Sequence, residues 1–332
     1  MNKIDIIVDL QYGDCGKGKV AHYLSSKNKY DFVVRYNGGA NAGHTIYHKG
    51  KKVITHQIPV GVMFGIPSII GPGCVVDPGL LKQEIKELRD AGISTKGKLF
   101  IASNCHVVTA KHKKADQGKN KIGTTGRGIG YAYTDKYARV GIRAGEVAEL
   151  KEYVIDFYNK VLLKKPRVLL EGAQGFGLDI DWGDYPYVTS SSCTTAGVLI
   201  NGFDYRAIGD VWGVAKIYET YVGAKDFEPK RKIFEKIREI GCEYGATTGR
   251  PRQCNYFNID TFKKASTISG VTHVVISKMD VLRELNEWKI ISNKKVIDLK
   301  TEKAMKYYIV KELAQLNIKK KDIHFSEKKD TI

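Results

Sequence analysis

The sequence predicts an α/β protein with a central, mostly parallel sheet, flanking helices and a P-loop-like nucleotide-binding loop, in a single domain over residues 1–332. Three observations favour this class. Short β-branched runs alternate with helical segments. Glycine-rich stretches follow most of those runs. The chain has 332 residues, 42% of them hydrophobic, which is enough to bury a large core.

The elements follow in order along the chain. A buried strand at 4–10 leads into a glycine-rich loop, and a helix is predicted at 19–27. Residues 118–133 are too rich in Gly and Thr for regular structure, so we expect a loop that closes over a ligand. The other predictions are a strand and glycine-rich turn at 30–45, a helix at 80–92, and strands followed by loops at 166–177, 211–223 and 272–280. Ligands bind at the carboxyl ends of parallel strands, so we expect the glycine-rich loops to converge there.

Composition excludes several classes of protein. No segment approaches ~18 consecutive apolar residues, so no membrane span is expected, and the N-terminus is typical of a strand rather than a signal peptide. Six cysteines without a C-x-x-C pair predict a reduced, cytoplasmic protein with no zinc site. The net charge of +18 favours an anionic partner. Nucleic acid is the less favoured partner, because the basic runs are scattered and no nucleic-acid-binding module is present.

The opening loop, QYGDCGKGKV, nearly matches the phosphate-binding pattern. Gly13, Gly18 and Lys19 have the required spacing, and Lys17 adds charge, but Val20 stands where a Mg²⁺-binding hydroxyl belongs. Asp14 is unusual because a carboxylate facing phosphates is repelled. Its residue type leaves two roles open, Mg²⁺ ligand or general base.

Other loops carry groups suited to anions and purines. His44, on the second glycine-rich turn, is a candidate proton donor or charge stabiliser, since no third metal ligand accompanies His44 and His48. Guanidinium groups suit phosphate or carboxylate, and a Lys-x-Asp pair suits guanine. The candidates of these kinds are Arg127, Gln174, Arg250, Arg252, Lys278 and Asp280.

Six blocks, taken in order, resemble the adenylosuccinate synthetase family in a short, archaeal-like form. They are QYGDCGKGK, RYNGGANAGHT, GTTGRGIGYAYTDKYARVGIR, EGAQGFGLDIDWGDYPYVTSS, YGATTGRPR and SKMDVL, from about residue 3 to about residue 290. The resemblance implies a ligase of purine biosynthesis. It would join aspartate to C6 of IMP through a 6-phosphoryl intermediate, using GTP and Mg²⁺.

The resemblance also implies a role for each site residue. Asp14 would take the N1 proton of the purine and, with the carbonyl of Gly43, hold Mg²⁺, while His44 would stabilise the transferring phosphoryl group. Arg139 would reach the partner's site in a homodimer. The remaining assignments are GTP to Gly13, Gly16, Lys17, Gly18, Lys19, Thr45, Lys278 and Asp280, the monophosphate to Asn41, Thr125, Arg139, Gln174, Thr189 and Arg250, and aspartate to Thr247, Thr248 and Arg252.

The chain departs from the family pattern at several positions. Cys15 stands for Glu, Tyr12 for Trp, Tyr221 for Arg and Lys225 for Gly. The C-terminal IHFSEKKDTI lacks the Gly and Pro of the loop that packs against guanine in the family. Phosphoryl transfer is still expected, but ATP stays open beside GTP as the donor.

Two alternatives remain. A phage branch of the family acts on dGMP, and IVDLQYG and the unusual C-terminus are similar to that branch. That branch typically has a smaller residue at the position of Asp14, which makes room for the 2-amino group, so Asp14 favours IMP. The second alternative is a catalytically inactive nucleotide-binding or nucleic-acid-binding relative. Retention of Asp14, His44, Arg250 and Lys19 argues against it.

Overall fold

The computed structural model describes residues 3–27, 29–117, 122–245, 249–327 and 332. Within these residues, nine strands form one sheet in which every neighbouring pair is parallel. In spatial order they are β17 (Ile323–Ser326), β14 (His273–Ser277), β11 (Ile208–Lys216), β1 (Ile4–Asp9), β10 (Val168–Glu171), β2 (Phe32–Arg35), β5 (Ser68–Ile70), β7 (Leu99–Ala102) and β9 (Val154–Ile155). The predicted α/β class with a parallel central sheet is confirmed.

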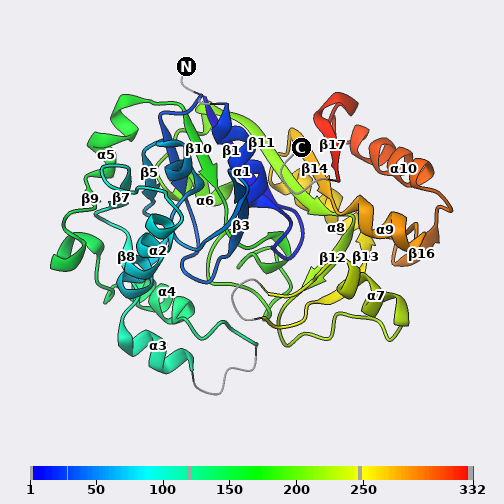
Figure 1. Cartoon of the computed structure of the whole chain (residues 1–332), viewed down its shortest axis with the longest axis horizontal. Coiled ribbons are helices and arrows are strands. Elements are labelled where there is room, and N and C mark those ends of the chain that lie inside the picture. Colours follow the sequence, from blue (N-terminus) through cyan, green and yellow to red (C-terminus); the bar gives the residue numbers. More distant parts are fainter. Residues whose placement is uncertain (1–2, 28, 118–121, 246–248, 328–331) are drawn as a thin grey trace.

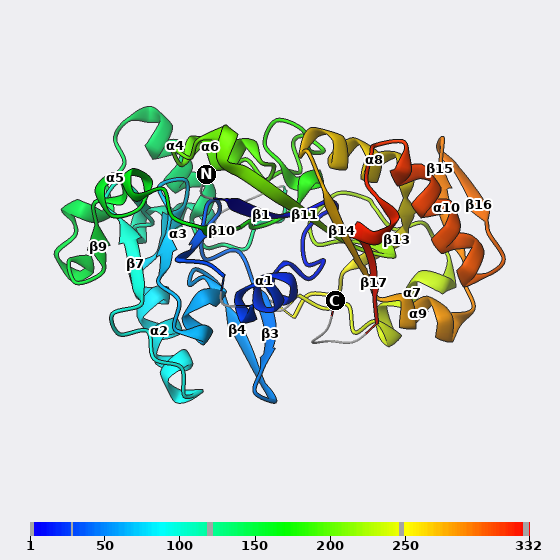
Figure 2. The same ribbon diagram turned by 90° about the horizontal axis from the view of Figure 1, so that it is seen from above.

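Helices flank this sheet along its whole width (Figures 1 and 2). Helix α1 lies against β1, β10 and the hairpin that follows β2. The helices are α1 (Lys17–Ser26), α2 (Pro78–Asp90), α3 (Ala110–Asp116), α4 (Ile129–Ala138), α5 (Phe157–Lys160), α6 (Ala196–Ile200), α7 (Lys232–Ile240), α8 (Ile259–Ile268), α9 (Met279–Leu285) and α10 (Glu302–Ala314). No helix in the described ranges has both the length and the apolar character needed to cross a membrane.

Smaller sheets extend from the main one. An antiparallel hairpin consists of β3 (His44–His48) and β4 (Lys51–Thr55), and a short parallel pair consists of β6 (Val75–Val76) and β8 (His106–Val107). The third is a mixed sheet in the order β12 (Tyr218–Tyr221), β13 (Gln253–Asn258), β15 (Lys289–Ser292) and β16 (Lys295–Asp298). The segment 211–223 therefore holds two strands, β11 and β12, rather than the one predicted.

Strand β1 is buried along its entire length, as its apolar run predicts. Its two acids do not break it because both are satisfied. Asp5 accepts hydrogen bonds from the Tyr30 hydroxyl at 2.7 Å and from the Asp210 amide at 3.0 Å. The second acid, Asp9, ends the strand and belongs to the site described below.

The predicted loop over 118–133 is partly wrong. Residues 118–121 lie outside the described ranges, and 122–128 are irregular, but helix α4 already begins at Ile129. Gly128, in the left-handed conformation with φ 75°, turns the chain into the helix, and its amide donates to the Asp116 carboxylate at 2.8 Å. The glycine content marks the start of this helix rather than its absence.

The carboxyl ends of the central strands meet at one edge of the sheet, where the glycine-rich segments gather. At that edge Arg35, the last residue of β2, lies 3.4 Å from Glu171, the last residue of β10. The expected convergence of the loops therefore holds, and this edge carries the candidate site.

Candidate active site

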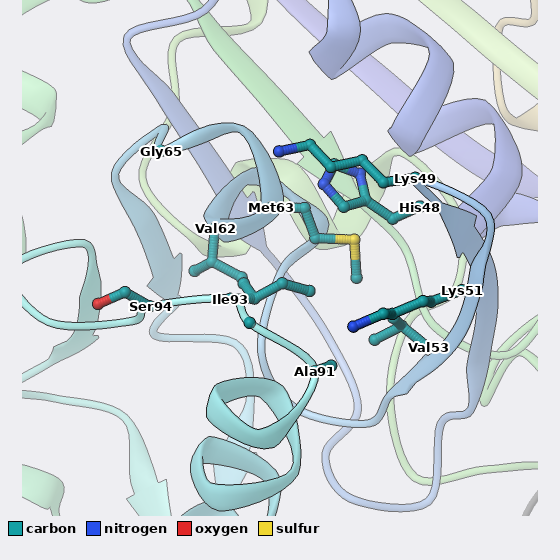
Figure 3. Close-up of a pocket in the computed structure, with 11 residues that line it drawn as sticks. His48, Lys49, Lys51, Val53, Val62, Met63, Gly65, Ala91, Ile93 and Ser94 are labelled. Carbon is teal, nitrogen blue, oxygen red and sulfur yellow. The ribbon is translucent and has the colours of Figure 1, made fainter.

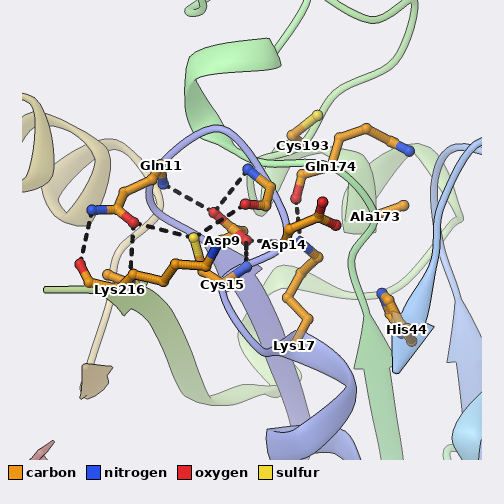
Figure 4. Close-up of polar contacts among 12 residues, drawn as sticks. Asp9, Gln11, Asp14, Cys15, Lys17, His44, Ala173, Gln174, Cys193 and Lys216 are labelled. Carbon is orange, nitrogen blue, oxygen red and sulfur yellow. Dashed lines mark hydrogen bonds and ion pairs between the residues drawn. The ribbon is translucent and has the colours of Figure 1, made fainter. Parts of the chain in front are cut away.

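The glycine-rich loop folds around the carboxylate of Asp9. Its Oδ1 accepts hydrogen bonds from the backbone amides of Gln11 at 3.0 Å and Gly13 at 3.2 Å. Its Oδ2 accepts from the Cys15 amide at 3.1 Å and from the Lys17 ammonium at 2.9 Å (Figure 4). Charge-assisted bonds to a buried carboxylate are strong, so the loop is shaped before any ligand binds. Sequence reasoning missed this role, although an acid directly between a buried strand and a glycine-rich loop was a usable signal.

The loop displays Asp14 in a strained conformation. Gly13 and Gly16 have φ values of 90° and 101°, and Asp14 itself has φ 59°, which is uncommon for a residue with a Cβ. The Asp14 side chain is 36% exposed. Such strain is held only where the surroundings determine it, and it is concentrated at functional sites.

Two lysines place positive charge beside the loop. Lys17 is buried, and its ammonium is held by Asp9 and by the backbone carbonyl of Gln174, which ties the loop to the turn after β10. Lys19 contacts the hydroxyl of Ser326 in β17. Helix α1 begins at Lys17 and has no acid in its first turn, so its N-terminus adds to the attraction for an anion.

His44 is buried next to this loop, with an exposed fraction of 6%. Its Nδ1 lies 3.2 Å from Nη2 of Arg35 and 3.8 Å from a carboxylate oxygen of Glu171. Burial, followed by the charges of Arg35 and Lys17, holds the pKa of His44 well below its ordinary 6.5. The imidazole is therefore neutral at physiological pH, and its single ring N–H can donate a hydrogen bond.

Gln174 has a side chain that lacks any partner within the described residues. Both amide atoms are buried and without a hydrogen bond, and the backbone has φ 57°. Buried polar atoms are normally paired, so this amide marks a place for a ligand. Gly38 packs closely on this amide, since a Cβ at Gly38 would lie 2.7 Å from Oε1 of Gln174. Asn41 lies three residues further along the chain, and its Oδ1 accepts a hydrogen bond from the Gly39 amide at 3.1 Å.

Arg252 pairs with the exposed carboxylate of the loop. Its Nη2 lies 2.8 Å from Oδ2 of Asp14, and its Nη1 bonds to Glu243. Glu243 is held in turn by the Lys216 ammonium at 2.7 Å and by the Tyr218 hydroxyl at 2.7 Å. Burial alone would raise the pKa of Glu243, but Lys216 and Arg252 lower it to about 2. Sequence reasoning selected Arg252 and missed Glu243 and Lys216, which the fold brings to it from separate segments.

Other predicted residues lie around the same edge. Arg127 donates to the Ala40 carbonyl, and Arg250 donates to the Thr124 carbonyl at 3.5 Å, so the 122–128 segment contacts both the turn after β2 and Arg250. Thr125 is exposed, and the amide of Thr189 donates to Leu178 at 2.8 Å.

The residues predicted for GTP are more widely spread. Lys278 has φ 71° and donates to the Gly241 carbonyl at 2.7 Å, while Asp280 is exposed in the first turn of α9. Thr45 is half-buried in β3 directly after His44, and Gly43 precedes the strand. Arg139 is exposed at the end of α4. Thr247 and Thr248 lie outside the described residues.

A cavity of about 300 Å³ lies at the turn of the β3–β4 hairpin, at the opposite end of the hairpin from His44 (Figure 3). Its lining includes Lys49, Lys51, Val62 and Ile93. None of the predicted site residues lines this cavity. The cavity is therefore separate from the candidate active site.

Oxygen ligands near the loop fit Mg²⁺. This ion is commonly held by one or two carboxylates together with substrate phosphates and water. Asp14 offers a half-exposed carboxylate on a loop suited to phosphate, and Gly43 offers a backbone carbonyl beside His44. The described residues contain no cluster of three or more His, Cys, Asp or Glu that would form an all-protein metal cage.

The edge of this parallel α/β sheet carries a phosphate loop, a strained carboxylate and a neutral buried histidine. This combination is typical of an enzyme that binds nucleotides. Comparisons with known proteins agree. The family model described as adenylosuccinate synthetase matches residues 6–165 and 146–323. The adenylosuccinate synthetase of Chlorobaculum tepidum is 39% identical over 359 residues, covering 90% of this chain and 82% of the relative. That of Chlorobium limicola is 40% identical over 344 residues, covering 87% and 79%.

Two solved structures are similar as well. Fully ligated adenylosuccinate synthetase from Plasmodium falciparum aligns with a TM-score of 0.78 and 31% identity, covering 92% of this chain and 86% of that one. The cyanophage S-2L succinoaminodeoxyadenylate synthetase, bound to dGMP and dATP, aligns with a TM-score of 0.73 and 23% identity, covering 93% and 98%. The second likeness shows the fold alone. The chain belongs to the adenylosuccinate synthetase family, which consists of ligases that form a C–N bond in purine biosynthesis.

Proposed function

We propose that this chain joins aspartate to C6 of IMP with consumption of GTP and so makes adenylosuccinate. The observation that carries the proposal is Asp14, a carboxylate displayed by the phosphate-binding loop. The helix that follows this loop packs through Gly18 against the neutral imidazole of His44. A carboxylate in that place is suited to remove a proton from a bound purine, and the imidazole is suited to meet a phosphoryl oxygen.

In the first step Asp14 accepts the N1 proton of IMP, and the purine O6 attacks the γ-phosphorus of GTP. The O6–P bond forms as the bond to the β-phosphate oxygen breaks, and GDP leaves. His44 donates a hydrogen bond to the transferring group. When Mg²⁺ is bound, Asp14 and the Gly43 carbonyl would hold it, and it would neutralise charge on the phosphates.

In the second step the amino group of aspartate attacks C6, the C6–O6 bond breaks, phosphate leaves with O6, and the attacking nitrogen releases a proton to solvent. The two Nη atoms of Arg252 bond to Asp14 and Glu243. Its Nε is buried and has no hydrogen-bond partner in the described part of the chain. A guanidinium held in this way suits a substrate carboxylate. We assign the aspartate site to Arg252 with Thr247 and Thr248.

The monophosphate site would be formed by Asn41, Thr125, Gln174, Thr189 and Arg250, and the unpartnered amide of Gln174 supports it. We further propose a homodimer in which Arg139 completes the partner's monophosphate site. Large apolar side chains surround Arg139 on the surface, with Tyr137 68% and Val140 69% exposed, as expected of a surface that a second copy covers.

The donor would bind at the glycine-rich loop, with its base at Lys278 and Asp280 and its phosphates at Gly13, Gly16, Lys17, Gly18, Lys19 and Thr45. An exposed carboxylate at Asp280 can accept from the N1–H and 2-amino groups of guanine, which supports GTP over ATP. Six unpaired cysteines agree with a cytoplasmic location.

Phosphate release tests the proposal. The chain is assayed with aspartate, Mg²⁺ and GTP, with IMP or dGMP as acceptor, and then with ATP in place of GTP. We expect release with IMP and GTP. Release with dGMP alone would contradict the choice of IMP and show that Asp14 does not exclude the 2-amino group. Release with neither acceptor would contradict the reaction itself.

A further inference from the structure

Three positions at which the chain departs from its family pattern lie together in the structure. The rings of Tyr12 and Tyr221 meet edge to face with centroids 5.7 Å apart. The Lys225 ammonium lies 5.1 Å from the centroid of the Tyr12 ring and 5.3 Å from that of Phe227. Phe227 packs on Tyr12 at 5.0 Å. Since these side chains contact one another, the departures form one unit, which we call the tyrosine–lysine cluster (Tyr12, Tyr221, Lys225 and Phe227).

Asp184 connects this cluster to a further loop. Its carboxylate forms an ion pair with Lys225 and accepts a hydrogen bond from the Tyr12 hydroxyl at 2.8 Å. Tyr12 immediately precedes Gly13 of the phosphate loop, and Asp184 lies on the segment that leads to Thr189. Lys225 therefore links three segments that are far apart in the sequence.

The Tyr12 ring also fixes the spacing between the phosphate loop and the turn after β10. A Cβ at Gly177 would lie 2.3 Å from the Tyr12 ring, so the ring packs directly on that backbone. Gly177 lies in a 3₁₀ turn (Phe176–Leu178) that closely follows Gln174. A shift of Tyr12 would therefore be transmitted to the segment that carries the unpartnered amide.

The two residues before Lys225 also contact the segment that carries Thr125. The Ala224 amide donates to the Ile122 carbonyl at 3.4 Å, and Gly123 packs against the backbone of Gly223 and Ala224. Thr125 lies two residues after Gly123. The chain around Lys225 therefore contacts both the segment that leads to Thr189 and the segment that carries Thr125.

Lys225 also interacts electrostatically with Glu219. The Glu219 side chain is buried, with 4% exposed, and its Oε1 has no hydrogen-bond partner among the described residues. Burial raises the pKa of Glu219 to about 8, Lys225 acts to lower it, and Asp184 adds to the rise. Two acids therefore depend on one ammonium group.

We propose that Lys225 is a positioning residue for the purine monophosphate: it holds the Tyr12, Asp184 and Ile122 segments at the separation that this substrate needs. The inference rests on the proposed function. It predicts that loss of the Lys225 charge selectively weakens binding of the monophosphate. The donor phosphates and aspartate should be less affected, because they are assigned to the loop interior and to Arg252.

The test compares Lys225→Met with Lys225→Arg by steady-state kinetics and by calorimetric titration with IMP. Lys225→Met should raise the KM and Kd for IMP by about tenfold, since small displacements of binding groups have effects of this order or larger. The KM values for GTP and aspartate should change by less than about twofold, and Lys225→Arg, which keeps a cation over the Tyr12 and Phe227 rings, should restore most of the affinity.

Lys264→Met is the matched control. Lys264 also lies over aromatic rings of this region, 5.8 Å from the centroid of Phe176 and 5.7 Å from that of Trp182, and its loss should leave the IMP constants unchanged. Unchanged IMP constants in Lys225→Met, or equal losses for all three substrates together with a lowered Tm, would overturn the proposal. If the unaltered chain turns over and only this pattern fails, the inference alone is wrong. If the unaltered chain neither binds IMP nor releases phosphate, the proposed function fails with it.

Discussion

Two buried carboxylates, Asp9 and Glu243, determine how the functional side chains are presented. Asp9 accepts three hydrogen bonds from the loop that follows it and a fourth from Lys17, the first residue of α1. Glu243 anchors Arg252, which in turn holds Asp14. Neither carboxylate is displayed to a ligand. Both carboxylates hold neighbouring site groups in place within the low-dielectric interior. Those groups therefore lose less conformational freedom when a substrate binds.

Glu243 should make folding stability depend on acid pH. Its pKa is about 2 in the folded chain against an ordinary 4.5, so its stabilising contribution is complete above pH 4.5 and is lost as the pH falls toward 2. A difference of this size corresponds to about 3 kcal/mol. The free energy of unfolding in urea should therefore be lower for Glu243→Gln than for the unaltered chain at pH 7, and the two should approach each other below pH 4.5.

Glu239→Gln is a matched control, since Glu239 is an exposed carboxylate on the adjacent helix α7. That variant should follow the unaltered chain across the whole pH range. Parallel curves for Glu243→Gln and the unaltered chain would show that Glu243 is not the source of the acid dependence.

At the scale of elements, the contact between α1 and β3 brings the phosphate loop to His44. A Cβ at Gly18 would lie 2.8 Å from the Cβ of His44, so the first turn of the helix and the first residue of the strand touch only because Gly18 has no side chain. The glycine that the phosphate-binding pattern requires thus has a second role, which is the close approach of the hairpin.

Gly18→Ala should separate these two elements. We expect a loss of stability of about 1–3 kcal/mol from overpacking, although alanine favours a helix, and a fall in kcat of at least about tenfold as His44 moves. Thermal unfolding and phosphate release measure the two effects.

Gly79→Ala serves as the comparison, because Gly79 is also in the first turn of a helix but its Cβ would meet the Asp77 carboxylate at an ordinary 3.5 Å. This variant should keep its activity. Full activity and stability in Gly18→Ala would refute the idea that the contact positions His44.

At the scale of the whole molecule, the proposed dimer makes each site depend on two chains. Asp14 would act in its own chain and Arg139 in the partner's. The exposed apolar side chains of Tyr137 and Val140 flank Arg139 at the end of α4. A site shared in this way is open to a complementation test, which a site within one chain is not.

Mixing Asp14→Asn chains with Arg139→Leu chains should restore turnover. Asp14→Asn should be slower by orders of magnitude because the base is lost, and Arg139→Leu should have a raised KM for the monophosphate. In a random mixture half of the dimers would be hybrids with one intact site, so about a quarter of the unaltered activity should return.

A mixture of Asp14→Asn and His44→Ala is the control, since both changes alter the site within one chain and no hybrid dimer gains an intact site. Absence of recovery in the first mixture would show that Arg139 does not complete a partner's site.

The sequence by itself determined the class of fold, the position of its glycine-rich turns and the family. These follow from local patterns: apolar strand runs, glycine where φ is positive, and the order of long motif blocks. Two errors in secondary structure remained. The segment 211–223 holds two strands rather than one. The loop assigned to 129–133 is helical, because the glycines there mark the N-terminus of α4 rather than a loop.

Only the tertiary structure decided which charged groups meet. The roles of Asp9, Lys216 and Glu243, the neutrality of His44 and the contacts of Lys225 depend on segments up to 205 residues apart. Burial and long-range ion pairing have no local sequence period. They arise when parallel strands bring their carboxyl ends to one edge of the sheet. Sequence patterns could therefore locate the site, but they could not predict its electrostatics.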